Sequence, residues 1–165
     1  MEFDSAGILF EDKDNSTFLS GWNPKQQAWS GFGGKRRGNE TAWETALREV
    51  IEELFGIFLL PVSLNTMQQA LSPMEFFQTK KYVCFIMPLT FVFRLSEMLE
   101  MIEYKSPFYK VFPQTKDDLL LKRTIQLKKT PEITELCFLK STFTGPIDFY
   151  FKSDILTLKG DSESD

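Results

Sequence analysis

The first part of the chain alternates short apolar runs with polar turns, a pattern typical of β-strands. Apolar side chains dominate residues 6–12 and 17–22, and the polar residues 12–16 predict a turn between them. Residues 28–34, with the sequence AWSGFGG, predict the end of a strand that breaks into a glycine turn. The chain is therefore expected to begin with strands.

Between residues 42 and 54 the apolar pattern changes to the spacing of an α-helix. The positions that share one face in this spacing are Trp43, Ala46, Leu47, Val50 and Leu54. Thr41 and Glu44 match a capping box at the start of the helix. Gly56 stands where a C-terminal helix glycine is expected. We therefore expect a helix over 42–54.

The later segments predict a mixture of strands and helices. In chain order we expect a strand over 57–64, a loop and then a long strand or hairpin arm over 72–93, a helix that starts near 96 and is stopped by Pro107, a strand over 132–140 and a closing helix over 146–159. Residues 115–129 fit a helix or an irregular connection. This order predicts an α/β (α+β) fold with a mixed β-sheet sandwiched between α-helices.

No internal repeat or linker interrupts the pattern, so we expect a single domain over residues 1–159. The tail 160–165 is small and acidic and is expected to be disordered. The N-terminal residues lack the basic segment of a signal peptide, and no apolar stretch reaches the ~18 residues that a membrane span needs. These features predict a cytoplasmic protein with no membrane partner.

Composition narrows the classes of function. The chain has 165 residues, a net charge of −4 and no histidine. The negative charge argues against a general nucleic-acid coat, which needs a basic surface. The lack of histidine excludes histidine triads, histidine metal ligands and histidine bases. Cys84 and Cys137 lie in apolar runs and are interpreted as buried, reduced thiols.

Like charge is crowded onto one face of the predicted helix. Glu49, Glu52 and Glu53 are spaced i, i+3, i+4 and therefore emerge on one side. Pairs of like charge at this spacing repel and destabilise the helix. A hard divalent cation prefers oxygen ligands, and its binding would make the crowded carboxylates favourable. Two glycines at 33–34 indicate close backbone approach, and Arg48 lies four residues before Glu52. The alternative is a solvated, glutamate-rich helix face.

These residues resemble the signature of the Nudix hydrolases, including the MutT-like members. The matching positions are Gly34, Glu40, Arg48, Glu49, Val50, Ile51, Glu52, Glu53, Gly56 and Ile57. One extra residue separates Glu53 from Gly56, because Leu54 and Phe55 stand where the family has one residue. The segment 95–130 has no counterpart in the resemblance and is expected to be an insertion.

The resemblance implies a Nudix fold and cleavage of a phosphoanhydride bond with Mg²⁺ or Mn²⁺. Glu49, Glu52 and Glu53 are implied as metal ligands, one of them also helping to activate water. Gly34 is implied to contribute a backbone carbonyl. Arg48 and Glu40 are implied to orient the carboxylates.

The segment AWSGFGGK, residues 28–35, resembles Nudix enzymes that act on oxidised purine nucleoside triphosphates. Trp29, Phe32, Lys35 and Arg36 are therefore candidates for binding a nucleotide substrate. The alternative for Trp29 and Phe32 is a place in the core at a strand end.

Other substrates and roles stay open on the sequence. Pro73 is compatible with ADP-ribose hydrolysis, and the basic run 35–37 is compatible with mRNA decapping at an RNA 5′ cap. A non-catalytic nucleotide-binding module is a further alternative. Glu132 and Glu135 are candidates for an additional acid, or else solvent-facing strand residues.

Overall fold

The computed structural model describes residues 2–125 and 131–163. Its described part contains a seven-stranded mixed sheet with the central order β3-β2-β1-β6-β5, in which β4 pairs with β1 and β7 with β2. The strands are β1 (Ser5–Asp12), β2 (Thr17–Asn23), β3 (Ala28–Ser30), β4 (Phe32–Lys35), β5 (Glu75–Thr79), β6 (Tyr82–Pro88) and β7 (Leu136–Lys140). Strands β1 and β6 are parallel, and the other pairs are antiparallel.

One edge of β1 is shared by two strands. Its residues 5–8 pair with β4, and its residues 11–12 pair with β2. The sheet therefore divides along this edge, and β4 lies at the division. The expected glycine turn at 33–34 is wrong, because both glycines belong to β4, where they pair with Gly7 and Ala6.

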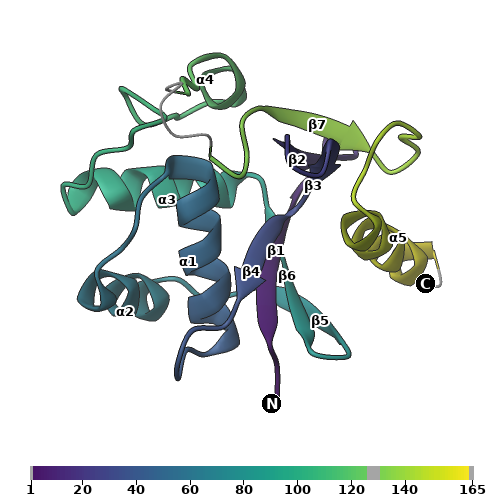
Figure 1. Ribbon diagram of the computed structural model, residues 1–165, viewed down its shortest axis with the longest axis horizontal. Coiled ribbons are helices and arrows are strands. Elements are labelled where there is room, and N and C mark those ends of the chain that lie inside the picture. Colours follow the sequence, from purple (N-terminus) through teal and green to yellow (C-terminus); the bar gives the residue numbers. More distant parts are fainter. Residues whose placement is uncertain (1, 126–130, 164–165) are drawn as a thin grey trace.

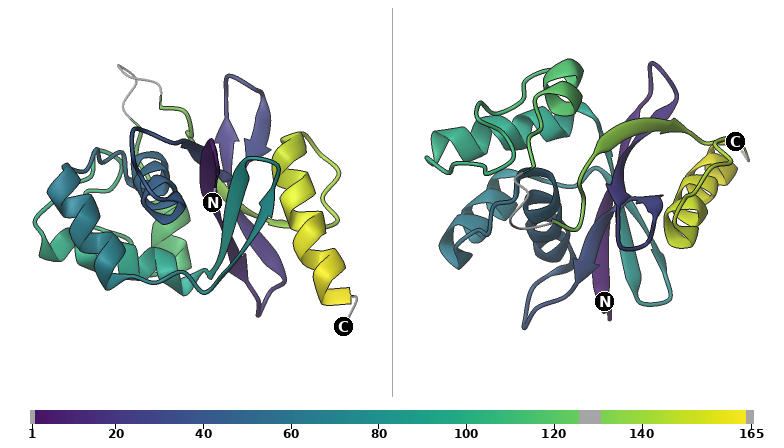
Figure 2. Two further views of the ribbon diagram at one scale, coloured as in Figure 1. Left: turned by 90° about the horizontal axis from the view of Figure 1, so that it is seen from below. Right: turned by 45° about the horizontal axis from the view of Figure 1, so that its top comes forward.

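The helices pack on both faces of the sheet, as expected for a sheet sandwiched between helices (Figures 1 and 2). They are α1 (Ala42–Phe55), α2 (Pro61–Ala70), α3 (Thr90–Met101), α4 (Lys116–Leu121) and α5 (Phe149–Glu163). Helices α1, α2 and α3 lie on one side of the sheet and α5 lies on the other. The predicted α/β architecture is confirmed.

Two groups of buried side chains hold these layers together. Alternation along β1 places Ala6, Ile8 and Phe10 in the core beneath α1, and Leu9 in the smaller core beneath α5. The larger core contains the apolar stripe of α1, where Leu47, Val50 and Ile51 are fully buried. Helix α1 is thereby fixed against the sheet, with its remaining face directed away from the core.

The ends of α1 follow the sequence prediction closely. Thr41 Oγ1 accepts the backbone N–H of Glu44, and Glu44 Oε1 accepts the backbone N–H of Thr41. Gly56 ends the helix with φ of 67°, a left-handed conformation that glycine adopts without steric cost. The capping box and the C-terminal glycine are both confirmed.

Several later elements differ from the prediction. Residues 57–64 do not form a strand: α2 begins at Pro61, a favoured residue at the first helical position. The apolar run 82–93 is split, since β6 ends at Pro88 and α3 begins at Thr90 rather than near 96. Helix α3 also ends at Met101, well before Pro107. Apolar runs of this length are compatible with buried strand and buried helix alike.

The last third of the chain gives a mixed outcome. Residues 116–121 form α4, while 126–130 lie outside the described residues. The predicted strand and closing helix are present as β7 and α5. Residues 160–163 continue α5 and 164–165 lie outside the described residues, and the disorder expected from residue 160 stays a prediction. Cys84 is buried and unpaired as expected, whereas Cys137 is only half-buried.

Among the helices of the described residues, none combines the length and the apolar character that crossing a bilayer requires.

Candidate functional site

The face of α1 that carries the glutamates lies against β4. The backbone N–H of Gly33 donates to Glu53 Oε1 at 2.8 Å. A Cβ atom added to Gly34 would lie 2.3 Å from Glu49 Cδ, so the Glu49 carboxylate fills the space that a side chain at position 34 would need. The two glycines therefore bring the strand backbone into contact with two of the predicted metal ligands.

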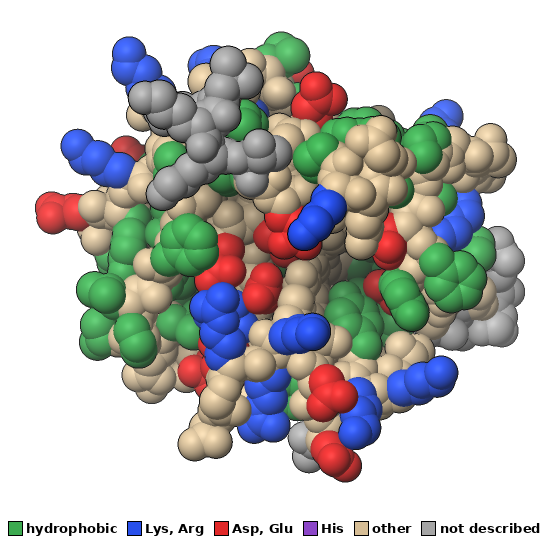
Figure 3. All heavy atoms as spheres, viewed as in Figure 1, with side chains coloured by type: hydrophobic (Ala, Val, Ile, Leu, Met, Phe, Trp, Pro, Cys, Tyr) green, Lys and Arg blue, Asp and Glu red, His purple; other side chains and the backbone are tan. Residues whose placement is uncertain are grey.

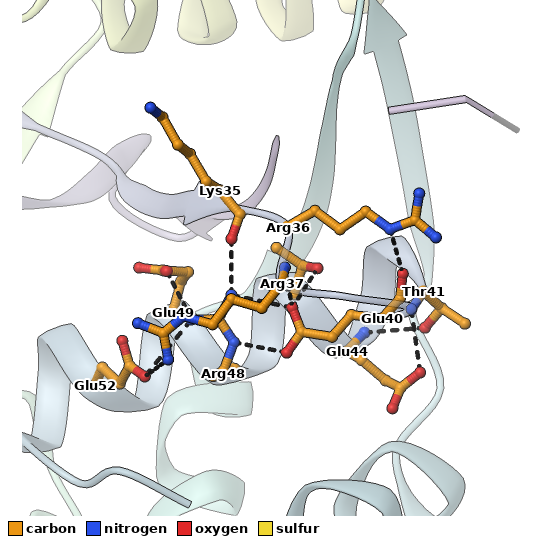
Figure 4. Close-up of polar contacts among 10 residues, drawn as sticks. Lys35, Arg36, Arg37, Glu40, Thr41, Glu44, Arg48, Glu49 and Glu52 are labelled. Atoms are coloured by element: carbon orange, nitrogen blue, oxygen red, sulfur yellow. Dashed lines mark hydrogen bonds and ion pairs between the residues drawn. The ribbon is translucent and has the colours of Figure 1, made fainter. Parts of the chain in front are cut away.

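Arg48 links the loop before α1 to the acidic face (Figure 4). Its Nε and Nη2 atoms donate to the two carboxylate oxygens of Glu40 at 2.6 and 3.0 Å. Nη2 also donates to the Lys35 carbonyl at 2.7 Å, and Nη1 donates to Glu49 Oε1 at 2.7 Å. Glu52 Oε1 lies 3.6 Å from Nη1, a longer contact than the one to Glu49. Arg48 therefore orients Glu49 directly and is itself held by Glu40.

The pKa values of this pair reflect a satisfied, buried ion pair. Arg48 is 5% exposed. Burial works to raise the pKa of Glu40, but hydrogen bonds from Arg48, the Arg37 N–H and Thr45 together lower it. Burial likewise opposes the charge of Arg48, and the hydrogen bonds to Glu40 and Glu49 raise the pKa of Arg48. Both groups are therefore charged at neutral pH, and through Arg48 the pair is bonded to the Glu49 carboxylate.

The remaining carboxylates repel one another. Burial and the charge of Glu132 raise the pKa of Glu53 well above its ordinary value, although the Gly33 N–H works against this. Burial and the charge of Glu49 raise the pKa of Glu52, and the same two causes raise the pKa of Glu132. Four carboxylates from α1 and the loop before β7 thus form one cluster of incompletely balanced negative charge, called here the acidic cluster (Glu49, Glu52, Glu53 and Glu132).

The acidic cluster fits a hard divalent cation in donor type and in charge. Carboxylate oxygens are the ligands that Mg²⁺ prefers in proteins. Within residues 2–125 and 131–163, no group of three or more His, Cys, Asp or Glu side chains converges closely enough to hold a metal as oriented. The reason is visible in the contacts, because Arg48 engages Glu49 and the Gly33 N–H engages Glu53.

Of the two downstream acids suggested by the sequence, the structure brings only Glu132 to the cluster. Its charge acts on Glu53, and the charge of Glu49 acts on it. The charge of Glu135 instead acts on the thiol of Cys137, on the strand that follows. Both glutamates are exposed, and they differ in that only the charge of Glu132 acts on the carboxylates of α1.

The predicted substrate residues are dispersed. Phe32 is 2% exposed and packs edge-on against Phe10, so its expected role in stacking on a base is wrong and the core alternative is correct. Trp29 is half-buried on the opposite face of the sheet, where it packs against Trp22 at 5.2 Å. The Lys35 side chain points away from α1 (Figure 4). These positions separate Trp29 and Lys35 from the core that contains Phe32.

Arg36 also points away from the acidic cluster. Its guanidinium lies 4.7 Å from the centre of the Phe3 ring, and its Nε donates to the Glu40 carbonyl at 2.9 Å. It lines a hollow of about 390 Å³ at the start of α1, together with Trp43 and Phe85. Arg37, not Arg36, reaches the cluster, with Nη1 3.5 Å from Glu52 Oε1.

The surface view shows how the acidic side chains are placed. Acidic side chains gather near the middle of this face, over α1 and the adjoining strands, and basic side chains border them (Figure 3). The surface is hollowed beside them, between the sheet and α5. Within the acidic cluster, the side chains of Glu49 and Glu52 are 13% and 12% exposed, so only a small part of each reaches the surface.

Two features of the site were not foreseen. Phe55, the residue in excess of the family spacing, is fully buried and packs against Tyr109 and Phe112 at about 6 Å between ring centres. Arg123 donates to the carbonyls of Glu53 and Leu54 at the end of α1. Neither role has a local signal, because each depends on partners more than fifty residues away in sequence.

Comparison with solved structures finds proteins of similar architecture. An Ap4A hydrolase of C. elegans, solved as a binary complex, has a TM-score of 0.51 and 13% identity over 98% of this chain and 99% of that chain. A MutT protein of Methanosarcina mazei Go1 has a TM-score of 0.49 and 15% identity over 98% and 96%. A hydrolase of the Nudix family from Clostridium perfringens has a TM-score of 0.41 and 11% identity over 96% and 98%.

No protein-family model matches the sequence, and no curated protein matches it either. The fold is therefore identified from the structure: a mixed sheet between helices, with a glutamate-rich helix against a glycine strand at its division. This arrangement is the Nudix fold.

Proposed function

We propose that the chain is a Mg²⁺-dependent Nudix hydrolase that cleaves a phosphoanhydride bond in a nucleoside di- or triphosphate derivative. Mn²⁺ is the alternative cofactor. The observation that carries the proposal is the acidic cluster itself. It gathers Glu49, Glu52 and Glu53 on one helix face next to the backbone of Gly33 and Gly34, and the charge of Glu132 acts on Glu53.

The charge balance explains why a cation belongs there. Like charges at this spacing destabilise a helix by a few tenths of a kcal/mol per pair. Burying carboxylates adds a desolvation cost that a bound cation removes. Glu49, Glu52 and Glu53, with the Gly34 carbonyl, would hold the ion. When bound, Mg²⁺ supplies Lewis-acid stabilisation of the substrate phosphates and acidifies a nearby water.

The residues of the chain have distinct parts in this proposal. Glu40 holds Arg48, and Arg48 holds the Glu49 carboxylate in place. The Gly33 N–H fixes one oxygen of Glu53. One carboxylate of the cluster takes the proton of the attacking water, since the chain has no histidine to do so. Arg37, which is exposed beside Glu52, is placed to meet substrate phosphates.

For the substrate, we propose a nucleoside triphosphate, with oxidised purine nucleotides tested first. With Phe32 in the core, recognition of the base falls to other residues, and Trp29 and Lys35 remain the candidates on the α5 side of the sheet. The free thiols of Cys84 and Cys137 suit the reducing cytoplasm.

A substrate panel tests the proposal. The purified chain is incubated with Mg²⁺ and, separately, with oxidised and ordinary nucleoside triphosphates, ADP-ribose, Ap4A and capped RNA, and products are separated by anion-exchange chromatography. We expect turnover of at least one nucleoside phosphate, abolished by chelator. A matched incubation of Glu53→Gln controls for contaminating phosphatases. If the chain binds these nucleotides but turns over none of them, it is a nucleotide-binding module rather than an enzyme.

A further inference from the structure

Resting on the proposed function, we propose that Arg123 is a positioning residue that holds Glu132 in the acidic cluster. Arg123 lies in the segment 95–130, which has no counterpart in the family resemblance. This would make residues 95–125, the described part of that segment, a working part of the site. The hydrogen bonds of Arg123 within the described residues go to backbone carbonyls, not to the carboxylates of the predicted metal ligands.

The Arg123 guanidinium joins two backbone segments that are distant in sequence. Nη1 donates to the Leu54 carbonyl at 2.5 Å, and Nη2 donates to the Glu53 carbonyl at 3.0 Å. Nη2 also donates to the Ile133 carbonyl at 3.0 Å, and Nε lies 3.4 Å from the Thr134 carbonyl. One side chain thereby fastens the last turn of α1 to the residues directly after Glu132.

The segment after Glu132 is held on its other side by the sheet. The Thr134 N–H donates to the Trp22 carbonyl at 3.0 Å, and Ile133 is 1% exposed. Gly21 of β2 makes room for Ile133, because a Cβ there would lie 2.5 Å from Ile133 Cγ2. Glu132 itself is exposed, and among the described residues neither a backbone hydrogen bond nor close packing of this kind holds it. Its position therefore depends on how Ile133 and Thr134 are held.

The position of Arg123 is itself built by the insertion. Its guanidinium lies 4.6 Å from the Phe108 ring centre and 5.8 Å from that of Tyr109. Tyr109 packs against Phe55, and Ser106 Oγ donates to the Phe55 carbonyl at 2.5 Å. A cation at the carboxyl end of α1 is also favoured by the helix dipole. The extra residue Phe55 thus anchors the segment from which Arg123 reaches both partners.

The planar fork of arginine is needed for this geometry. A lysine keeps the charge but presents one nitrogen, which cannot serve carbonyls on both α1 and the 133–134 segment in the same way. Arg123→Lys therefore loosens Glu132 while leaving a cation at the helix end. Arg94→Lys is the matched control, because it makes the same substitution at an exposed arginine of α3.

The experiment measures Mn²⁺ binding by isothermal titration calorimetry in the parent chain, Arg123→Lys, Glu132→Gln, the double variant and Arg94→Lys. We expect Glu132→Gln and Arg123→Lys each to raise the Kd for Mn²⁺ by roughly 10-fold, the lower end of effects seen for residues that support metal ligands. The double variant should bind like Glu132→Gln alone, because both changes remove one interaction. Arg94→Lys should bind like the parent.

Three outcomes overturn the inference: Mn²⁺ binding unaffected by Glu132→Gln, multiplied losses in the double variant, or a loss in Arg94→Lys equal to that in Arg123→Lys. The Glu132→Gln arm stands even if the position-123 variants do not fold, because Glu132 is exposed. Failure of the proposed function is distinguishable. If the variants bind Mn²⁺ more weakly but the parent turns over no nucleotide, the role of Arg123 stands and the proposed hydrolase activity is wrong. If the parent does not bind Mn²⁺, both proposals are wrong.

Discussion

Glu40 and Arg48 form a two-pronged ion pair across the start of the acidic face. Arg48 Nε lies 2.6 Å from Glu40 Oε2, and Arg48 Nη2 lies 3.0 Å from Glu40 Oε1. Glu40 lies in the loop before α1 and Arg48 lies two turns into the helix. Since Arg48 also donates to Glu49, the pair controls the orientation of a predicted metal ligand from outside the metal face.

Glu40→Gln should destabilise the protein and lower its activity. The change leaves the buried Arg48 charge incompletely paired, which costs about 2–4 kcal/mol of unfolding free energy. Urea denaturation followed by tryptophan fluorescence measures the loss. Arg37→Ala is the control, because the Arg37 side chain is 64% exposed and such surface changes cost below about 0.5 kcal/mol. Equal stability of the two variants would contradict the role given to the pair.

Glu53→Gln should abolish turnover and leave the protein folded. Glutamine still accepts the Gly33 N–H, and it removes a buried charge that its neighbours repel. The melting temperature without metal is therefore expected to equal or exceed that of the parent. Turnover should fall by more than about 100-fold, the upper end for residues that merely support a metal ligand. Activity within a few-fold of the parent would remove Glu53 from the site.

Gly34→Ala should reduce activity more than stability. The new methyl group would lie 2.3 Å from Glu49 Cδ and would displace that carboxylate, which is the mobile end of its side chain. We expect kcat to fall by about 10–100-fold, with a change in unfolding free energy of about 1 kcal/mol. Gly160→Ala, where an added Cβ meets nothing within 4 Å, is the control for adding a methyl group. Unchanged kcat in Gly34→Ala would argue against Glu49 as a ligand.

Deleting Phe55, which restores the family spacing, should destabilise the protein rather than improve it. The deletion removes a fully buried ring from between Tyr109 and Phe112. It also moves Gly56 out of register with its contact to Phe108. Phe55→Ala alone should cost about 3–5 kcal/mol in urea denaturation, and the deletion should cost at least as much. Phe58→Ala is the control, because Phe58 is 74% exposed.

Asp154 should make stability fall as the pH rises. Burial and the charge of Asp148 raise the pKa of Asp154 from 3.8 to about 7 in the folded chain. The folded state therefore favours the neutral carboxyl, and this preference becomes a cost between pH 3.8 and about 7. Above this range Asp154→Asn should be more stable than the parent by about 1–3 kcal/mol, a value reduced for partial solvent exposure. Below it, the two should agree.

Thermal unfolding of both proteins at about pH 4 and about pH 8 measures this difference. Glu75→Gln serves as the control for replacing a carboxylate by an amide, because Glu75 is exposed on β5. A constant difference between Asp154→Asn and the parent across the range would show that the carboxyl titrates normally.

Local chemistry was readable wherever the partners are close in sequence. The spacing of the glutamates, the Thr41–Glu44 cap and the C-terminal Gly56 all depend on residues within or next to one helix. That helix ends within one residue of the predicted position. The 57–64 segment was misread because an apolar run followed by proline suits a strand and a helix start equally well. Only packing against α1 and the sheet resolves that ambiguity.

By itself, the sequence determined the glutamate-rich helix, its caps and its likeness to the Nudix box, because periodicity and capping are interactions between near neighbours along the chain. The tertiary structure alone decided that Phe32 belongs to the core, that Glu132 and not Glu135 joins the acidic cluster, and that Phe55 and Arg123 tie the insertion to the end of α1. These outcomes depend on which residues distant in sequence share one desolvated space, and no local pattern contains that information.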